Sequence, residues 1–299
     1  MARLSRVTTR IDWAPGTHER RVESFYSRGA DSFGDCHGGY LNFGLWDEGI
    51  RDYLGAAENL VRRLGEWGGL GPDSELLDVG CGFGAQDVFL ARAFHPARIV
   101  AVDVTFPHVL AARERAAKAG LGLEVRFQHG SATDLELPDA SFTHVTAIEG
   151  IVHFKTRELF LRQARRVLKP GGTLLLADYC LARPPRSLAD RLFVRAACAG
   201  WQIPKENVET VASYREKLLA TGFRDVEIER VGARTIPGYF REQRTWAHLK
   251  SMLKIRGPLG VLGGFAIDLV AWLAWSRGQL DYILVKAKSG DTIRNSVPT

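Results

Sequence analysis

Three glycines that follow a short apolar run constrain the fold of this chain more than any other feature. The run "ELLDV" ends at Val79, and Gly80, Gly82 and Gly84 follow before "AQDVFLARAF" continues with helical periodicity. A strand that passes through glycines into a helix directs the amides at the start of that helix toward a ligand. The segment therefore predicts a strand–loop–helix unit with a binding loop at its turn.

Strand-like and helix-like segments alternate from this loop to Tyr179. Further strands are predicted at "RIVAVDV", "LEVRFQHG", "FTHVTAIEG" and "TLLLADY". The helices "FPHVLAARERAAKAG" and "TRELFLRQARRVL" lie between them, and "KPGG" forms a turn before the last of these strands. Two more strands, "DVEIERV" and "LDYILVKAK", follow a long interruption. The alternation is typical of βαβ units, so an α/β fold with a doubly wound sheet is expected.

The composition excludes some classes of function. The net charge is +6, and acidic residues are mixed among the basic ones, so no nucleic-acid-binding surface is expected. Cys36, Cys81, Cys180 and Cys198 lack C-x-x-C spacing and are interpreted as free thiols, and no residue cluster predicts a metal site. The opening stretch "MARLSRVTTRIDWAPG" lacks the apolar core of a signal peptide, so a cytoplasmic location is expected.

One apolar stretch, "PLGVLGGFAIDLVAWLAW" at 258–275, resembles a membrane span in composition. Its length is marginal, and it contains Asp268 and three glycines. We expect a buried helix or a lid element there, and weak contact with a membrane surface stays open.

Asp103 closes the strand "RIVAVDV". A carboxylate in that position accepts hydrogen bonds from ribose hydroxyls, which predicts a ribose-bearing cofactor. A P-loop is excluded because no lysine follows the glycines. The dinucleotide pattern is not excluded by the loop alone, since Ala85 stands where its third glycine is expected and alanine is allowed there.

The order of four segments separates these cofactors. "ELLDVGCGFG", "VDV", "GSATDLELPDASF" and "RVLKPGGTLLLADY" follow one another over residues 70–180. This series resembles the class I S-adenosylmethionine-dependent methyltransferases, in the small-molecule branch that includes sterol and tocopherol C-methyltransferases and natural-product methyltransferases. The resemblance implies a Rossmann-like sheet of seven strands whose last strand runs antiparallel, and "LDYILVKAK" suits that strand.

The resemblance also implies a set of cofactor residues. Asp78 and the glycine loop would hold the methionine part, Asp103 the ribose, and Val104, Ser131 and Ala132 the adenine. Many relatives have an acid at the position of Ser131, whose hydroxyl is an uncharged and weaker acceptor. The full cofactor-binding set comprises Tyr26, Asp78, Gly80, Cys81, Gly82, Gly84, Gln86, Asp103, Val104, Ser131 and Ala132.

Glu149 and His153 are the candidates for catalysis. They follow the strand "FTHVTAI", and parallel sheets place their sites at the carboxyl ends of strands. A carboxylate stabilises the cation formed when an alkene carbon is methylated, whereas a histidine takes the proton from a hydroxyl acceptor. The alternatives are that Glu149 holds the N-terminal lid and that His153 is structural. Glu149 tips the expectation slightly toward methylation of carbon rather than oxygen.

Aromatic and apolar residues outside the alternating region are expected to cover the acceptor. Aromatic faces favour the sulfonium cation and exclude water. Arg241 and Arg244 are expected either to meet an anionic group or, more simply, to be solvated. The predicted pocket residues are Tyr40, Phe43, Trp46, Trp246 and Phe265, with packing of the lid as the alternative.

The sequence thus predicts one domain in three parts. Residues 1–70 form an N-terminal helical lid segment, 71–288 form the S-adenosylmethionine-binding core with lid insertions at about 181–208 and 234–279, and 289–299 form a flexible tail. The expected activity is methyl transfer to an apolar or amphipathic small molecule, such as an isoprenoid or a polyketide-type natural product. An NAD-dependent oxidoreductase, and a protein that uses the same cofactor site for cyclisation or binding, are the alternatives. The sequence leaves open whether the protein forms a homodimer.

Overall fold

The computed structural model describes residues 10–27 and 37–290, and the statements below concern these residues. Cys36 and residues 291–299 of the predicted tail lie outside them, whereas Ser289, its first residue, is buried in the last strand, so the tail does not begin at 289. Cys81, Cys180 and Cys198 are free thiols, as expected. A seven-stranded sheet organises the chain in the order β3-β2-β1-β4-β5-β7-β6. β7 pairs antiparallel with both β5 and β6, while the other neighbours pair in parallel, so the predicted fold class is confirmed. The strands are β1 Glu75–Val79, β2 Arg98–Asp103, β3 Val125–His129, β4 Phe142–Ile148, β5 Leu168–Leu181, β6 Phe223–Arg230 and β7 Leu280–Ser289.

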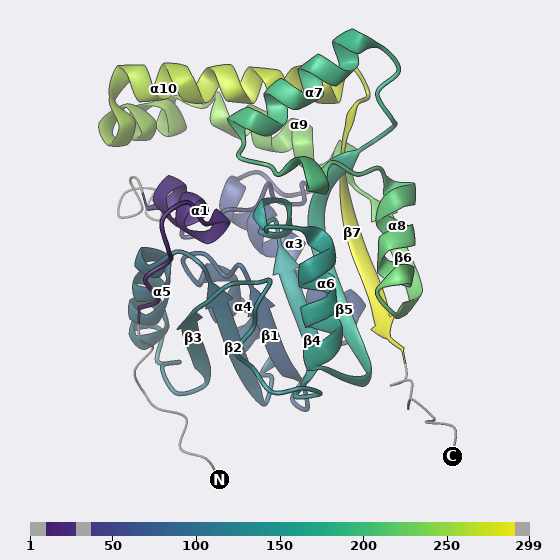
Figure 1. Cartoon of the computed structure of the whole chain (residues 1–299). Helices are drawn as coiled ribbons and strands as arrows, with labels where there is room; N and C mark the ends of the chain where they lie inside the picture. The colour runs from purple at the N-terminus through teal and green to yellow at the C-terminus, as the bar shows by residue number, and fades with distance from the viewer. Residues whose placement is uncertain (1–9, 28–36, 291–299) are drawn as a thin grey trace.

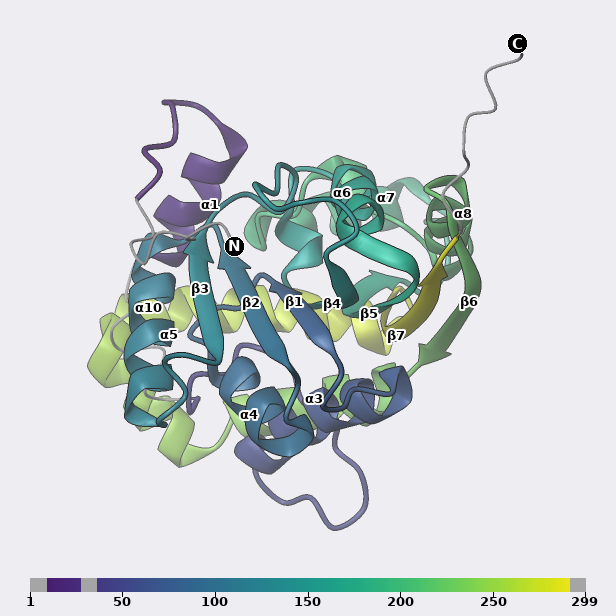
Figure 2. The same ribbon diagram turned by 90° about the horizontal axis from the view of Figure 1, so that it is seen from below.

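Helices cover both faces of this sheet (Figures 1 and 2). One face carries α3 Tyr53–Gly68, α4 Ala85–Phe94 and α5 Phe106–Lys118. The other carries α6 Arg157–Val167 and α8 Val211–Ala220. Each layer buries an apolar helix face, which explains the near-continuous apolar runs of the central strands. α3 packs on the sheet with a row of buried residues, so this part of the expected N-terminal lid belongs to the core.

The segment "KPGG" is the one irregular part of the central strands. β5 includes these residues, but its register with β4 shifts between Phe142 and His144. Phe142 is paired with Leu168 and His144 with Thr173, so the residues between them bulge out of the ladder. Gly171 has a φ of +73°, which glycine adopts without strain. The predicted turn is therefore present as a bulge within the strand.

A second layer lies over the carboxyl ends of the parallel strands (Figure 1). It consists of α1 His18–Tyr26, α7 Leu188–Gly200, α9 Gly232–Gln243 and α10 Trp246–Ser276, which is kinked at Gly257. Two short 3-10 helices lie in the connections: η1 Ile151–His153 between β4 and α6, and η2 Lys205–Asn207 between α7 and α8. We call this layer the cover.

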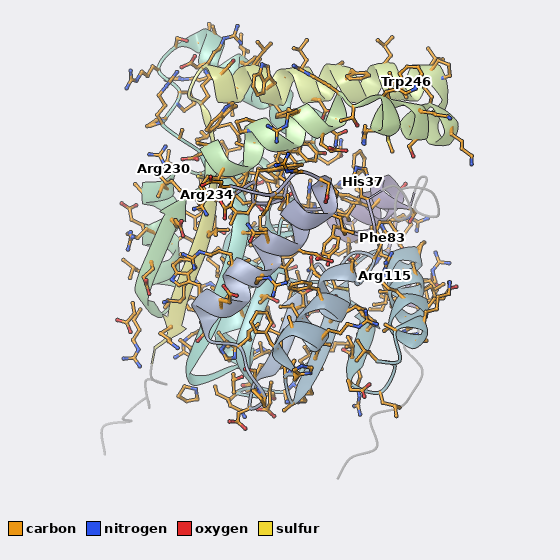
Figure 3. All side chains as sticks on the ribbon, turned by 180° about the vertical axis from the view of Figure 1, so that it is seen from behind. His37, Phe83, Arg115, Arg230, Arg234 and Trp246 are labelled. Atoms are coloured by element: carbon orange, nitrogen blue, oxygen red, sulfur yellow. The ribbon has the colours of Figure 1, made fainter. Side chains whose placement is uncertain are left out.

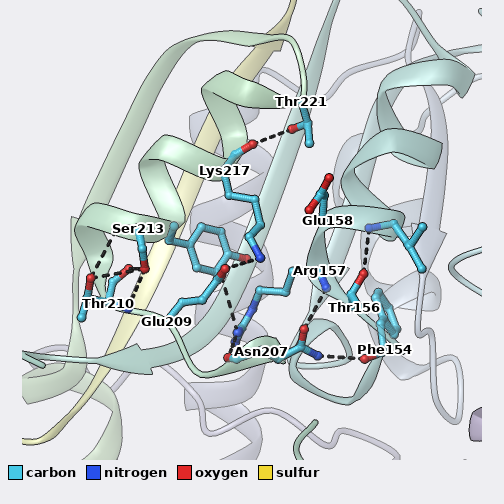
Figure 4. A network of polar contacts seen from close by, with 12 residues as sticks. Phe154, Thr156, Arg157, Glu158, Asn207, Glu209, Thr210, Ser213, Lys217 and Thr221 are labelled. Atoms are coloured by element: carbon cyan, nitrogen blue, oxygen red, sulfur yellow. Dashed lines mark hydrogen bonds and ion pairs between the residues drawn. The ribbon is translucent and has the colours of Figure 1, made fainter. Parts of the chain in front are cut away.

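A buried arginine fastens η1 and η2 to the sheet (Figure 4). Arg157 lies at the start of α6 and is 1% exposed. Its Nε donates to Asp178 at 2.7 Å, and its guanidinium also donates to the carbonyl oxygens of Tyr179 and Asn207. The Asn207 amide donates in turn to the carbonyl oxygens of Val152 and Phe154, at 3.0 and 2.8 Å. The short segment that follows β4 is thereby held in one position.

Replacing Arg157 with methionine is expected to lower the free energy of unfolding by about 3–5 kcal/mol, because it leaves the Asp178 carboxylate buried without its cation. Urea unfolding measures this change. Arg162→Met on the same helix is the matched control, since Arg162 pairs with Glu158 on the surface and should change stability by less than about 1 kcal/mol. Equal effects of the two substitutions would contradict the structural role of Arg157.

Candidate active site

A cavity of about 310 Å³ lies between the carboxyl ends of the parallel strands and the cover. Its floor comes from the loops after β1, β2, β3 and β4, and its roof from α1, α9 and α10. Cavities of this size suit small-molecule ligands. Of the residues predicted from the sequence, the cavity is lined by Tyr26, Phe43, Gly80, Cys81, Gly82, Gln86, Asp103, Val104, Ser131, Ala132, Glu149, His153 and Phe265.

The glycine loop adopts the expected conformation. Gly80 and Gly82 line the cavity and have φ angles of +83° and +54°. A Cβ atom on Gly80 would lie 3.3 Å from the Cα atom of Gly150, so a side chain there would crowd the loop after β4. Gly84 does not line the cavity; a Cβ atom on it would lie 2.8 Å from that of Ala112, so this glycine serves the packing of α4 against α5. The structure therefore does not place Gly84 with the other predicted cofactor residues at the cavity.

Asp103 is 8% exposed at the end of β2 and lines the cavity. Its two carboxylate oxygens accept hydrogen bonds from the backbone amides of Gly82 and Thr105, at 2.9 and 2.8 Å. Burial by itself would raise the pKa of Asp103, but His108 and the two amides outweigh it and lower the pKa below the usual value. The carboxylate is thus kept charged and is tied to the glycine loop.

Asp78 does not reach the cavity, which corrects its expected role. It is fully buried, and its carboxylate accepts hydrogen bonds from Gln86 at 2.5 Å and Thr146 at 2.7 Å. Burial raises the pKa of Asp78 to about 6. Gln86 does line the cavity, so Asp78 acts on the cavity by fixing the side chain of Gln86.

Glu19 was missed by the sequence analysis. It lies in the first turn of α1 and lines the cavity, and Ser131 Oγ donates to its Oε1 at 3.2 Å. Ser131 stands where many relatives have an acid, so the helix in the cover brings a carboxylate to the same place. No local signal could have revealed this contact, because the two residues are 112 positions apart.

We expect Glu19→Gln to weaken binding of S-adenosylhomocysteine about tenfold, the value of one hydrogen bond to a charged group. Calorimetry measures the affinity, and Glu48→Gln, an exposed acid away from the cavity, is the control. An analogue of S-adenosylhomocysteine with hypoxanthine in place of adenine lacks the amino group of the adenine ring. If Glu19 accepts a hydrogen bond from that amino group, the wild type should prefer the adenine compound more strongly than the variant does. An unchanged preference would rule out this contact of Glu19.

Glu149 is 8% exposed and has a φ of +59°, a left-handed conformation that is unusual for a glutamate. Its carboxylate accepts hydrogen bonds from the amide of Phe43 and the hydroxyl of Tyr282, both at 2.6 Å, and from the hydroxyl of Tyr179. Burial raises the pKa of Glu149 to about 7, although these donors act in the opposite direction. Glu149 thus joins the loop at Phe43 to β5 and β7, the arrangement expected of a carboxylate that holds the lid.

His153 and Tyr26 form a polar pair that faces the cavity. The Tyr26 hydroxyl lies 2.8 Å from His153 Nε2, and Nε2 of His18 lies 2.7 Å from the carbonyl oxygen of His153. Burial lowers the pKa of His153 to about 4. Its imidazole is therefore neutral at physiological pH and can accept a proton from the hydroxyl beside it.

One wall of the cavity is aromatic, but only part of it was predicted. Phe43 stacks on Tyr239 with ring centroids 3.7 Å apart, and Trp201 lies edge-on to Phe43. Tyr239, Trp201 and Met252 also line the cavity. All three lie in the predicted lid insertions, but Tyr239 and Trp201 were not named as pocket residues. They lie in segments without a motif, and only the fold brings them next to the glycine loop.

Three predicted pocket residues do not line the cavity and are corrected. Tyr40 is buried in the core, where its carbonyl oxygen accepts a hydrogen bond from Tyr53. The indole nitrogen of Trp46 donates to the carbonyl oxygen of Phe43 at 2.9 Å, so Trp46 supports the wall from behind. Trp246 is 73% exposed at the outer edge of the cover (Figure 3).

Arg241 and Arg244 do not line the cavity either. Both are exposed, and they lie over the rings of Trp46 and Trp272, at 5.3 and 5.6 Å. The simpler expectation of solvated arginines holds for both. Among the residues that the structure describes, no group of three His, Cys, Asp or Glu side chains could hold a metal ion.

Known proteins support the assignment of the fold and of the loop. A family model described as "Methyltransferase domain" matches residues 77–176. The chain is 38% identical over 211 residues to erythromycin 3''-O-methyltransferase of Saccharopolyspora erythraea, covering 67% of this chain and 68% of that protein. It is 30% identical over 270 residues to 27-O-demethylrifamycin SV methyltransferase of Amycolatopsis mediterranei, covering 88% and 96%. The crystal structure of the [4+2]-cyclase SpnF has the same fold, with a TM-score of 0.76 at 24% identity over 93% of this chain and 98% of that one.

The fold, the glycine loop and these relatives define an S-adenosylmethionine-dependent methyltransferase. The chain belongs to the class I S-adenosylmethionine-dependent methyltransferases, and S-adenosylmethionine is its cofactor. This overturns the alternative of an NAD-dependent oxidoreductase. The cavity suits the cofactor, because Gly80 and Gly82 leave space beside the loop and the charged Asp103 faces that space.

Proposed function

We propose that this enzyme methylates a hydroxyl group of an apolar or amphipathic natural product of the polyketide type. The observation that carries the proposal is the pair of His153 and Tyr26, which contacts a cavity with an aromatic wall beside the cofactor loop. The two relatives described above are a methyltransferase of erythromycin and one of a rifamycin, and the name of the first specifies oxygen as its acceptor. Both names support a hydroxyl on a large, partly apolar molecule.

The cofactor supplies an electrophilic methyl group on a sulfonium sulfur. We propose that Asp103 accepts hydrogen bonds from its ribose hydroxyls and that Glu19 and Ser131 contact its adenine. Gly80, Gly82 and Gln86 then lie beside the methionine part. Phe43, Tyr239 and Trp201 exclude water from the reacting atoms and present aromatic faces to a cation.

The proton of the acceptor hydroxyl has a direct route away from the cavity. The Tyr26 oxygen accepts it while the Tyr26 hydroxyl passes its own proton to Nε2 of His153, 2.8 Å away. A neutral imidazole with a lowered pKa is a weak base, so this transfer has to accompany attack of the oxygen on the methyl group. Placement of the acceptor supplies the rest of the rate enhancement.

Methylation of carbon was slightly favoured from the sequence because Glu149 is a carboxylate near the strand ends. In the structure, that carboxylate accepts hydrogen bonds from Phe43, Tyr179 and Tyr282 and holds the loop of Phe43. Three donors reduce its capacity to stabilise a carbocation. The arrangement supports oxygen as the acceptor, with the Tyr26–His153 pair as the acid–base group.

Incubation with methyl-labelled S-adenosylmethionine and a panel of macrolides and other polyketides tests the proposal. Each compound should be offered both with a free hydroxyl and with that hydroxyl already methylated. We expect label in a new methoxy group of the free compounds alone. Label on carbon would contradict the choice of acceptor, and an unlabelled rearranged product would favour the cyclisation that the structurally similar SpnF is named for.

A further inference from the structure

We propose that the outer surface of the cover binds an anionic lipid surface, with α7 and α10 lying in the plane of the membrane interface. This surface consists of the exposed side chains of 186–200 and 241–277. The inference rests on exposure and charge and does not depend on which acceptor the enzyme methylates.

The helix α7 presents a mixed apolar and basic face to solvent. Leu188, Arg191, Leu192 and Arg195 are all exposed. They are spaced by three or four residues, so they lie along one side of the helix. In a protein without a partner, leucines at these positions contribute only unfavourable contact with water.

The second half of α10 has two faces with different surroundings. Gly260, Val261, Gly264, Phe265 and Asp268 line the cavity, which fixes the side that faces inward. Outward-facing leucines alternate with them along the helix: Leu259 is 85% exposed, and Leu262 and Leu269 are also exposed.

The most apolar window within Gly257–Ser276 has a mean hydropathy of 1.6, yet only 12% of that window is buried. The expectation of a buried helix is therefore wrong for most of this stretch, and α10 is a lid whose outer face remains apolar. The inner face of α10 lines the active-site cavity. The helix therefore fits a position in the membrane–water interface better than a position across the bilayer.

Charge identifies the kind of surface. Among the described side chains of 186–200 and 241–277, every exposed charged residue is basic. The acids in these ranges, Asp190, Glu242 and Asp268, are partly buried. The exposed basic residues are Arg186, Arg191, Arg195, Arg241, Arg244, Lys250, Lys254 and Arg277.

Exposed leucines among basic side chains match the interfacial helices that bind anionic lipids. A second copy of the chain fits less well. In a two-fold symmetric dimer the same patch meets itself, which would bring these basic residues together without acids to pair with. A nucleic acid would match the charge but would leave the leucines without an apolar partner.

Sedimentation of the full-length protein with lipid vesicles tests the proposal. We expect binding to vesicles of phosphatidylcholine and phosphatidylglycerol, weak or no binding to phosphatidylcholine alone, and release by added salt. Leu259→Asp with Leu262→Asp should abolish binding. Arg191→Glu with Arg195→Glu should weaken it by at least about tenfold, since each basic residue near an anionic surface contributes about fivefold.

Leu123→Asp and Arg126→Glu are the matched controls. Leu123 is 83% exposed and Arg126 is exposed, and both lie at the amino end of β3, opposite the cover. The controls should bind vesicles as the wild type does, and all variants should bind S-adenosylhomocysteine normally. Failure of the wild type to bind anionic vesicles would overturn the proposal. So would a concentration-dependent dimer that Leu259→Asp dissociates, because it would assign the surface to a second copy.

Discussion

Replacing His153 with alanine should lower kcat by about 10²–10⁴-fold, the usual contribution of a positioned acid–base group. The affinity for S-adenosylhomocysteine should change by less than about threefold, since the proposed role of His153 is to take the proton of the acceptor through Tyr26, its hydrogen-bond partner. The backbone contact of His153 with His18 involves a carbonyl oxygen, which alanine retains. Steady-state kinetics on an acceptor found with labelled cofactor, together with calorimetry, measures both quantities.

Two further measurements distinguish a catalytic role of His153 from a structural one. Tyr26→Phe removes the hydroxyl that is proposed to relay the proton, and it should lower kcat as His153→Ala does. In the wild type, the loss of kcat at acid pH that is due to His153 should lie near pH 4 rather than near 6.5, because burial lowers its pKa. His144→Ala, at the opposite end of β4, is the control. An unchanged kcat in His153→Ala would remove this residue from the mechanism.

Replacing Asp103 with alanine is expected to weaken binding of S-adenosylhomocysteine by more than about a hundredfold. The substitution removes the proposed acceptor for the ribose hydroxyls and also releases the amides of Gly82 and Thr105. Hydrogen bonds to a charged group contribute about 1.5–3 kcal/mol each, so loss of two suffices for this factor. Calorimetry measures the affinity, and thermal unfolding without ligand shows whether the loop still folds.

Asp134→Ala is the control for Asp103, because Asp134 is an exposed acid just beyond Ser131. It should leave the affinity nearly unchanged. Asp103→Asn keeps an oxygen acceptor but removes the charge, so it should have a smaller effect than alanine. If Asp103→Ala bound S-adenosylhomocysteine as tightly as Asp134→Ala does, the proposed ribose contact would be wrong.

The sheet and the glycine loop could be predicted because their signals are local. Apolar runs, helical periodicity and the glycines Gly80 and Gly82 each predict the local structure from neighbouring residues alone. Asp103 follows from its place at the end of a strand, and His153 from its place after β4. Because the carboxyl ends of parallel strands lie at the same edge of the sheet, the predicted topology is enough to place these residues together.

The cover could not be predicted in the same way. Glu19 reaches Ser131, and Tyr239 reaches Phe43, only because helices from both ends of the chain fold over the strand ends. Trp46 and Trp246 are of a residue type common in pockets, but Trp46 supports the aromatic wall from behind and Trp246 lies on the outer edge of the cover. For the apolar stretch of α10, the sequence could not distinguish a buried helix from a lid element, because hydropathy depends on the side chains and not on what surrounds them.

The position of β7 sets a condition on when this enzyme can become active during synthesis. β7 is the last strand in the part of the chain that the structure describes, yet it lies between β5 and β6, and its Tyr282 is one of the donors to Glu149. β6 reaches the sheet only by pairing with β7. A nascent chain can form β1 to β5 and the glycine loop early, but the tie that holds Phe43 over the cavity has to wait for Tyr282 to leave the ribosome. The cofactor loop is therefore made early in translation, and a closed active site is one of the last features to form.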